Sequence, residues 1–280
     1  PELAENLGYF ENISLKYEGT FTGGPQDIQL VATDQVDFGY AFNGAILQSV
    51  AKGVKIKSVI ASYGSDEETS YGYYTLTDSD IKSAKDLIGK KIGVNTLGAH
   101  YDFILKEYLR QSGLKEEEIK EVSLVVIPSA NVEQALRNKQ IDVAALGMVF
   151  QDKAVERGGI TPLFTDFELL GAFTGGGHFF SDKFIEENPD AVKEFVEGTA
   201  KAIEWARETP KEEVIARLQS ILEKRDRSED AELAKYWKST GIAEAGGVIN
   251  EKDFQIWIDG LIGNGELKEN QIQFEDLYTN

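Results

Sequence analysis

The chain offers few side chains that could perform catalysis or bind a metal. It has two histidines, His100 and His178, and no cysteine among its 280 residues. The absence of cysteine excludes disulfides, thiolate ligands and a cysteine nucleophile, and neither histidine has a second one at helical spacing to form a zinc site. Motifs of serine hydrolases, phosphate loops, zinc proteases and dinucleotide-binding folds are also absent. The residues therefore favour a binding protein over an enzyme, with no cofactor and no metal.

The stretch most suited to ligand chemistry is a turn of small residues, Thr96 to His100. It follows an apolar run, Ile92 to Val94, and it opens an amphipathic helix expected from Ala99 to Leu109. The positive end of a helix dipole disfavours an imidazolium, so we expect His100 to act as a neutral hydrogen-bond donor. Small residues let a ligand approach the first amides of the helix.

Similar turns occur elsewhere, each placed before a helix or after a strand. In open parallel sheets, ligands bind outside the carboxyl ends of strands, where helix N-termini present free amides. The set predicts a site for an anionic or strongly polar small molecule. The turns are Thr20 to Gly24, Phe42 to Ala45, Thr96 to His100, and Ser129 to Asn131.

Composition limits the classes of partner. The chain carries 48 acidic and 29 basic residues, a net charge of -19, and no basic cluster interleaved with aromatic residues. This argues against nucleic acid as a partner. No apolar run reaches the roughly 18 residues that a transmembrane helix requires, and the apolar content of 41% suffices for a packed core. The abrupt opening on "PELAENLGYF" suggests that the numbering starts inside a longer precursor.

A strand, turn, helix and strand pattern occurs twice and indicates two similar α/β lobes. The first copy starts with an alternating strand near Ile13 and ends in a strand from Val36 to Ala41. The second runs from a strand at Val122 to Ile127 to a strand at Ile141 to Leu146. We expect lobe I to comprise 1–77 and 175–280, and lobe II to comprise 78–174. A strand at Tyr71 to Leu76 is expected as the crossover.

The C-terminal part is expected to be mostly helical. Asn188 caps a helix that has Pro189 at its first position, and apolar residues recur at helical spacing from Ala191 onward. The charged run Glu223 to Lys235 is expected as a solvated helix face. Trp237 and Trp257 are expected to anchor the core of the last helices.

Several segments together resemble a known family. They are "QVDFGY" at residue 35, "IKSAKDLIGKKIGV" at residue 81, "TLGAH" at residue 96 and "FIEENPDAVKEF" at residue 184. The chain is similar to the sulfonate, taurine and nitrate group of type II periplasmic binding proteins, over nearly all of residues 1 to about 210. This resemblance implies two Rossmann-like α/β lobes joined by two crossover strands, a central cleft that closes on the ligand, and a helical C-terminal tail.

The resemblance also implies the residues of the binding site. Relatives commonly have Asp-Thr/Ser-Pro where this chain has Asn43-Gly44-Ala45, and no arginine falls in a carried-over turn. A sulfonate would therefore be held by amides, hydroxyls and helix dipoles. The expected ligand-binding residues are Thr22, Gly23, Gly24, Phe42, Asn43, Gly44, Ala45, Tyr63, Thr96, Gly98, Ala99, His100, Met148, Phe150, Thr174 and His178.

The function implied is that of an extracytoplasmic substrate-binding protein of an ABC importer. It would be a monomer with a permease partner, anchored to the membrane, if at all, through a lipid outside this sequence, as in lipoproteins. The expected ligand is a small organic anion such as a sulfonate, taurine or nitrate. A thiamine-pyrimidine-like heterocycle is the alternative, since Phe42, Tyr63, Tyr101 and Phe150 fall near the expected site.

Two other readings stay open. The first is an enzyme on the same fold, of the menaquinone-pathway type; thiamine-pyrimidine synthases are disfavoured, because they use a cysteine-rich motif that this chain lacks. The second is the effector-sensing domain of a transcription regulator, although no helix-turn-helix precedes the fold here. The carboxylates Asp66 to Glu68 are expected on a solvated loop, with contact to a ligand amine as the functional option.

Overall fold

The chain folds into two compact units. The structure is a computed structural model that describes residues 1–19, 23–225, 230–263 and 265–280. Unit 1 comprises Pro1–Thr69 and Phe173–Asn280, and unit 2 comprises Ser70–Ala172. The sequence predicts residues 70–77 in lobe I and 173–174 in lobe II. The strand Tyr71–Leu76 instead pairs with two strands of unit 2, and residues 173–174 pair with a strand of unit 1.

Unit 2 is built on a five-stranded sheet with the strand order β5-β4-β6-β3-β7. Strand β4 runs parallel to β5 and β6, and β3 runs antiparallel to β6 and β7. The carboxyl ends of β4, β5, β6 and β7 therefore meet the amino end of β3 at one edge of the sheet. The strands are β3 (Tyr71–Leu76), β4 (Lys91–Val94), β5 (Ser123–Val126), β6 (Val143–Gly147) and β7 (Ile160–Thr165).

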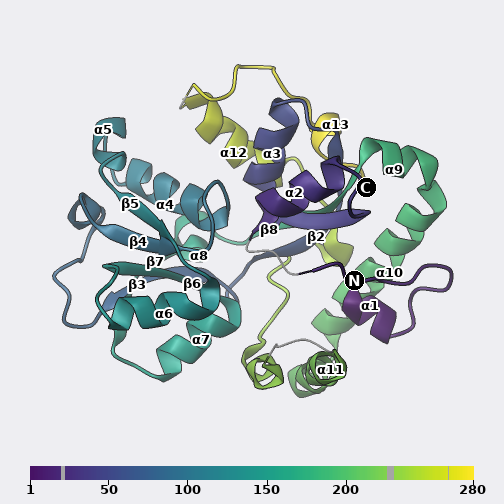
Figure 1. Ribbon diagram of the computed structural model, residues 1–280, viewed down its shortest axis with the longest axis horizontal. Helices are drawn as coiled ribbons and strands as arrows, with labels where there is room; N and C mark the ends of the chain where they lie inside the picture. Colours follow the sequence, from purple (N-terminus) through teal and green to yellow (C-terminus); the bar gives the residue numbers. More distant parts are fainter. Residues whose placement is uncertain (20–22, 226–229, 264) are drawn as a thin grey trace. The chain divides into compact units, whose positions relative to one another are not determined.

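Helices cover both faces of this sheet, and Figure 1 shows α6 and α7 on one side and α4 on the other. Successive residues of β3 alternate accordingly, because strand side chains point to opposite faces. Tyr73 hydrogen-bonds to α4, and Tyr74 packs with the buried cluster of α6 and α7. The elements are η1 (Ala84–Leu87), α4 (His100–Gln111), α5 (Glu116–Ile119), α6 (Ser129–Arg137), α7 (Met148–Glu156) and α8 (Asp166–Leu170).

Unit 1 contains a three-stranded sheet in which β8 is antiparallel to both neighbours. One face packs against α10 through an aromatic and aliphatic cluster that includes Phe180 and Phe195. The other face lies against α2. The approach is close, since a Cβ atom at Gly24 of α2 would lie only 2.4 Å from the Cβ atom of Ala41 on β1. The elements are α2 (Gly24–Ala32), β1 (Phe38–Phe42), α3 (Asn43–Ala51), β2 (Ile56–Ser65), β8 (Phe173–Ser181) and α9 (Asp182–Glu187).

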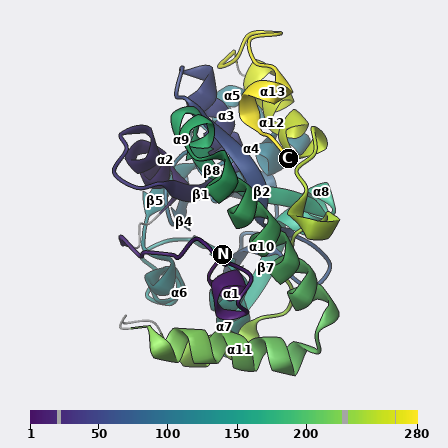
Figure 2. The same cartoon turned by 90° about the vertical axis from the view of Figure 1, so that its right-hand side faces the viewer.

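The C-terminal part is helical to a smaller extent than its sequence predicts. Asn188 takes the N-cap position of α10 and Pro189 opens the helix, as expected, but the Asn188 side chain forms no capping hydrogen bond. Figure 2 shows α1 beside α10 and α11. Between α11 and α12 the described residues contain only two short 3₁₀ turns. The elements are α1 (Glu2–Asn6), α10 (Pro189–Glu208), α11 (Lys211–Lys224), η2 (Ala231–Tyr236), η3 (Ala245–Gly247), α12 (Lys252–Gly263) and α13 (Phe274–Leu277).

Three expectations for this unit need correction. No strand forms near Ile13, because carboxylates replace a strand partner: Glu194 accepts the amides of residues 11–13 and Glu5 accepts that of Leu15. Trp257 is buried as expected, but Trp237 is partly exposed after η2. The charged run at 223–235 is not one helix face, because α11 ends at Lys224; residues 226–229 lie outside the described part.

The described helices include none that is both long and apolar enough to cross a bilayer.

Candidate functional site

The carboxyl edge of the unit 2 sheet gathers most of the residues expected in this unit. Val94 ends β4 and leads into the turn Thr96–His100, and Gly147 ends β6 and leads into Met148. Tyr71 opens β3 opposite Gly147, beside the end of β7. The edge therefore joins turns that are distant in sequence, as expected for a ligand site on strands of this direction.

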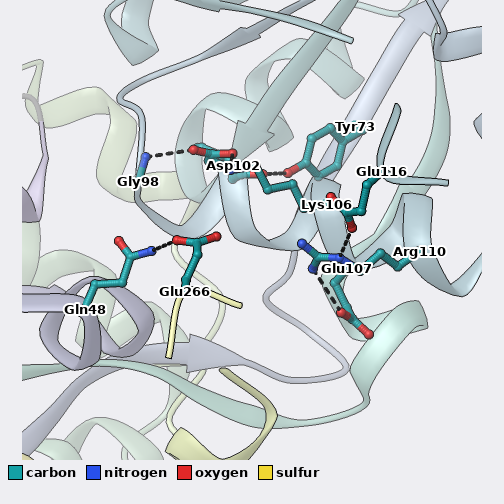
Figure 3. Close-up of polar contacts among 10 residues, drawn as sticks. Gln48, Tyr73, Gly98, Asp102, Lys106, Glu107, Arg110, Glu116 and Glu266 are labelled. Atoms are coloured by element: carbon teal, nitrogen blue, oxygen red, sulfur yellow. Dashed lines mark hydrogen bonds and ion pairs between the residues drawn. The ribbon is translucent and has the colours of Figure 1, made fainter. Parts of the chain in front are cut away.

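The turn before α4 is fixed by its own hydrogen bonds. Gly98 has a φ of +66°, which favours glycine, and its amide donates to Oδ2 of Asp102 at 2.9 Å. The other oxygen of Asp102 forms an ion pair with Lys106 at 2.9 Å. Figure 3 shows Asp102 reaching back to Gly98 from the first turn of the helix. The amides of Tyr101 and Asp102 have no hydrogen-bond acceptor in the part of the chain that the structure describes.

His100 forms a buried pair with Asp166, a residue that the sequence analysis did not select. Nε2 of His100 lies 2.9 Å from Oδ2 of Asp166, and these residues are 6% and 0% exposed. Oδ1 of Asp166 accepts the amide of Tyr71 at 2.8 Å, and the Tyr71 ring centroid lies 4.5 Å from that of His100. A carboxylate only accepts hydrogen bonds, so Nε2 of His100 is the donor to Asp166.

Two further tyrosines complete this cluster. The Tyr73 hydroxyl donates a hydrogen bond to the carbonyl of Tyr101. Figure 3 labels Tyr73, the donor of this bond. A Cβ atom at Gly147 would lie 2.2 Å from Cδ1 of Tyr71 and 2.7 Å from the Tyr101 hydroxyl, so both rings need glycine there. Burial raises the pKa of the Tyr73 and Tyr101 hydroxyls well above their ordinary value of 10.0. Both phenols therefore stay neutral.

Met148 is held in an unusual backbone conformation at the same edge. Its φ is +51°, and its side chain is half exposed where α7 begins. A non-glycine residue in this region costs on the order of 1 kcal/mol, and such strain concentrates at functional sites. Phe150, two residues later, is partly exposed on the same helix. Leu97, in the turn before α4, is also half exposed, so this edge presents apolar as well as polar groups.

In unit 1, Asn43 joins the start of α3 to two other elements. Its Nδ2 donates to the carbonyls of Thr174 at 3.0 Å and Asp253 at 3.2 Å. Asp253 in turn accepts the amide of Thr174 at 3.3 Å, and burial raises the pKa of its carboxyl. Oδ1 of Asn43 and Oγ1 of Thr174 are buried without a hydrogen-bond partner among the described residues. The structure thus brings Asn43 and Thr174 together, with Asp253 as a partner that sequence reasoning missed.

The other residues expected in unit 1 lie around this joint or pack the sheet. Phe42 caps α3 and meets Trp257 edge to face at 4.8 Å, and Gly44 and Ala45 are buried in the first turn of α3. The Tyr63 ring lies against the backbone of Gly176, where a Cβ atom would be 2.5 Å from it. Gly23 caps α2, and Gly24 allows α2 to approach β1 closely.

His178 is placed apart from that joint, farther along β8. It lies opposite Tyr40 and packs among aromatic rings, with Phe38 at 6.1 Å and Phe195 at 5.7 Å. Burial lowers the pKa of its imidazole well below the ordinary value of 6.5. His178 is therefore a neutral ring within the packing between the sheet and α10.

Two other expected features take different places. Thr22 lies outside the described residues. Asp66 caps a turn, because its Oδ1 accepts the amides of Glu68 and Thr69, and its Oδ2 accepts the Ser239 hydroxyl at 2.6 Å. Its carboxylate is thus engaged within unit 1. Among the described residues, no group of three histidine, cysteine or acidic side chains is placed to hold a metal ion.

A comparison with protein families decides the relationship of the chain. The family model described as NMT1/THI5 like matches residues 3–213. The chain belongs to the NMT1/THI5-like family. The match ends before α12, so Asp253 and Trp257 lie outside the matched residues.

The relatives of the chain include proteins named as binding proteins and proteins named as enzymes. A protein of Brucella abortus strain 2308 that is named as a binding protein is 26% identical over 267 residues, which cover 92% of this chain and 78% of the relative. A 4-amino-5-hydroxymethyl-2-methylpyrimidine phosphate synthase of Legionella pneumophila is 24% identical over 216 residues, covering 75% of this chain and 65% of the relative. The chain thus has relatives named as enzymes as well as relatives named as binding proteins.

Solved structures show the fold. The periplasmic aliphatic sulphonate-binding protein of Escherichia coli superimposes with a TM-score of 0.68 at 18% identity, over 93% of this chain and 80% of that one. The periplasmic nitrate-binding protein of Synechocystis gives 0.71 at 14% identity, over 99% of this chain and 82% of that one. This family member therefore has the α/β fold of periplasmic binding proteins, as the resemblance implied.

Proposed function

We propose that this protein is the extracytoplasmic substrate-binding component of an ABC importer, and that it captures a small organic anion of the sulfonate or taurine type without transforming it. Its permease would be the partner that receives the ligand. Relatives and solved structures named as binding proteins support this class of function.

The observation that carries the proposal is the start of α4. The amides of Tyr101 and Asp102 have no acceptor among the described residues, and they lie at the carboxyl edge of the unit 2 sheet. Such amides, together with the helix dipole, stabilise a negative charge. The turn Thr96–His100 and the segment Met148–Phe150 contain no lysine or arginine. We therefore assign the anionic group to the amides, with Gly98, Ala99 and His100 as further contacts in unit 2.

A screen for ligands tests the proposal. Purified protein, freed of bound solutes by unfolding and refolding, would be mixed with ethanesulfonate, taurine, nitrate and several pyrimidines, and its melting temperature recorded. A sulfonate present at a free concentration of 100 times its Kd should raise the free energy of unfolding by about 2.7 kcal/mol, because only the native state binds it. Calorimetry would then give the affinity. If no anion raised the melting temperature, the assignment to organic anions would be wrong.

A flat heterocycle is the second candidate, and the rings at the unit 2 edge favour it. Tyr71 and His100 lie 4.5 Å apart, Tyr101 adjoins both, and the apolar side chains of Leu97 and Met148 are half exposed nearby. Aromatic side chains and a few polar groups suit a ring that stacks and hydrogen-bonds. The same screen separates the candidates, because this one requires a pyrimidine to stabilise the protein and every sulfonate to fail.

A further inference from the structure

Met148 carries the single sulfur atom of the chain, which has one methionine and no cysteine. Its side chain is 50% exposed where α7 begins, at the carboxyl edge of the unit 2 sheet. An accessible methionine sulfur is oxidised to the sulfoxide by peroxides. Oxidation of sulfur in this protein therefore falls on one residue, and that residue lies at the edge where ligand binding is proposed.

The backbone at Met148 gives no reason for a methionine. Its φ of +51° lies in the left-handed region, which glycine and asparagine occupy at lower cost. The start of α7 has no capping hydrogen bond from a side chain either. The residue type is therefore explained by its apolar side chain, not by the turn or by the helix.

The side chain of Met148 begins close to the turn of the proposed ligand contact. Strands β4 and β6 are paired and parallel, so the segments that follow them leave the same edge of the sheet at neighbouring positions. The first of these segments contains Leu97, which is 51% exposed. A thioether and an isobutyl group are thus among the apolar groups that this edge offers to the hydrocarbon part of a ligand.

We infer that Met148 is a site of reversible oxidation by peroxides that controls ligand binding at this edge, an inference that rests on the proposed function. In the reaction, the sulfur attacks one oxygen of hydrogen peroxide, and an S–O bond forms as the O–O bond breaks. The leaving hydroxide takes the proton of the transferred oxygen and becomes water. The sulfur loses two electrons and the peroxide gains them.

Oxidation replaces an apolar contact by a polar, hydrated one. A hydrocarbon chain that packs on the sulfoxide must displace its water without offering a hydrogen bond in return. The loss of affinity should therefore grow with the length of the chain. The Kd of pentanesulfonate should rise about tenfold on oxidation, whereas that of methanesulfonate should rise less than about threefold.

Calorimetry before and after treatment with hydrogen peroxide measures both Kd values. The intact mass should increase by one oxygen atom, and peptide mapping should place that atom on Met148. Methionine sulfoxide reductases A and B together should restore the original Kd, since each reduces one epimer of the sulfoxide. Met148→Leu has no sulfur, so its Kd for pentanesulfonate, whatever its value, should be the same before and after peroxide.

Val155 offers a matched control position, because it lies on the same helix and is 51% exposed. Seven residues of helix place it about 10 Å farther along α7. The double variant Met148→Leu/Val155→Met therefore carries one sulfur of similar exposure away from the proposed contact. Peroxide should oxidise it at a similar rate and leave its Kd for pentanesulfonate unchanged.

The outcomes that contradict the inference differ from those that contradict the proposed function. If the untreated protein binds pentanesulfonate and complete oxidation of Met148 leaves this Kd unchanged, the inference is wrong and the proposed function stands. The same conclusion follows if oxidation of the double variant weakens binding as much as oxidation of the wild-type protein. If the untreated protein binds no sulfonate, taurine or nitrate, both are wrong.

Discussion

Nε2 of His100 and Oδ2 of Asp166 lie 2.9 Å apart, and both side chains are buried at the carboxyl edge of the unit 2 sheet. They are 66 residues apart in sequence, on α4 and α8. This contact, together with the amide of Tyr71, ties two helices and a strand to one carboxylate. The pair is therefore a structural joint of unit 2, at the edge of the sheet where the ligand contact is proposed.

Replacing Asp166 should destabilise the protein strongly. Asp166→Ala leaves His100 and the Tyr71 amide without their acceptor, and removal of one partner of a buried pair costs about 3 kcal/mol. Asp166→Asn keeps one oxygen acceptor and should cost about 1 kcal/mol. Urea denaturation monitored by circular dichroism measures both. Equal losses for the two variants would show that the acceptor oxygens do not matter.

Gly98 and Gly113 form a matched pair of glycines at the two ends of α4. Their φ angles are +66° and +82°, and a Cβ atom at either would meet no atom within 4 Å. Alanine at each should therefore cost a similar amount of stability, about 1 kcal/mol, through backbone strain alone. Gly98→Ala should also weaken ligand binding, because it disturbs the turn that presents the α4 amides. Calorimetry should show at least a tenfold larger Kd for Gly98→Ala than for Gly113→Ala.

Gly113, which follows α4, is a better control than Lys106, which lies on the helix. Lys106 pairs with the same aspartate that accepts the Gly98 amide, so its replacement also affects the turn. If both glycine variants weakened binding equally, the α4 turn would not be a ligand contact.

Asn43 should contribute to stability through its donor group. Asn43→Ala removes two hydrogen bonds and leaves the buried carbonyls of Thr174 and Asp253 without that donor, at a cost of about 2 kcal/mol. Asn43→Asp should cost more, because a carboxylate would then face both carbonyls. The free energy of unfolding in urea at pH 7 checks this order. A more stable Asp variant would contradict the donor assignment.

His178 should make stability depend on pH in the mildly acidic range. Because burial holds its pKa well below 6.5, the folded protein keeps the ring neutral while the unfolded chain takes up a proton below about pH 6.5. This stabilising contribution is complete above pH 6.5 and is lost as the pH falls, by at most about 1.4 kcal/mol per pH unit.

The variant His178→Phe isolates this effect, because phenylalanine fits an aromatic environment and does not titrate. Between pH 6.5 and 5 its unfolding free energy should fall less steeply than that of the wild-type protein, whatever the absolute difference. Parallel slopes would mean that His178 is protonated in the folded state.

Features set by local pattern could be predicted from the sequence. The strand Tyr71–Leu76 and the N-cap position of Asn188 before Pro189 lie where the sequence predicts them, and the two strands of the second copy are shifted by one or two residues. Alternating or helical periodicity records which side of an element is buried, so it survives in a single sequence. The segment near Ile13 alternates in the same way, but the carboxylates of Glu5 and Glu194 take its amides, and pattern alone could not show this.

The candidate site was predicted only to the extent that it lies on turns after strands. The sequence by itself determined that Thr96–His100 opens a helix and that no cysteine or second nearby histidine supports catalysis. Only the tertiary structure decided that Asp166 holds His100 and that Asp253 holds Thr174, because these carboxylates sit 66 and 79 residues from their partners. A sequence of 48 acidic residues carries no local signal for which carboxylate is buried. Burial is a property of the packed sheet and helices, and so is the chemistry that it creates.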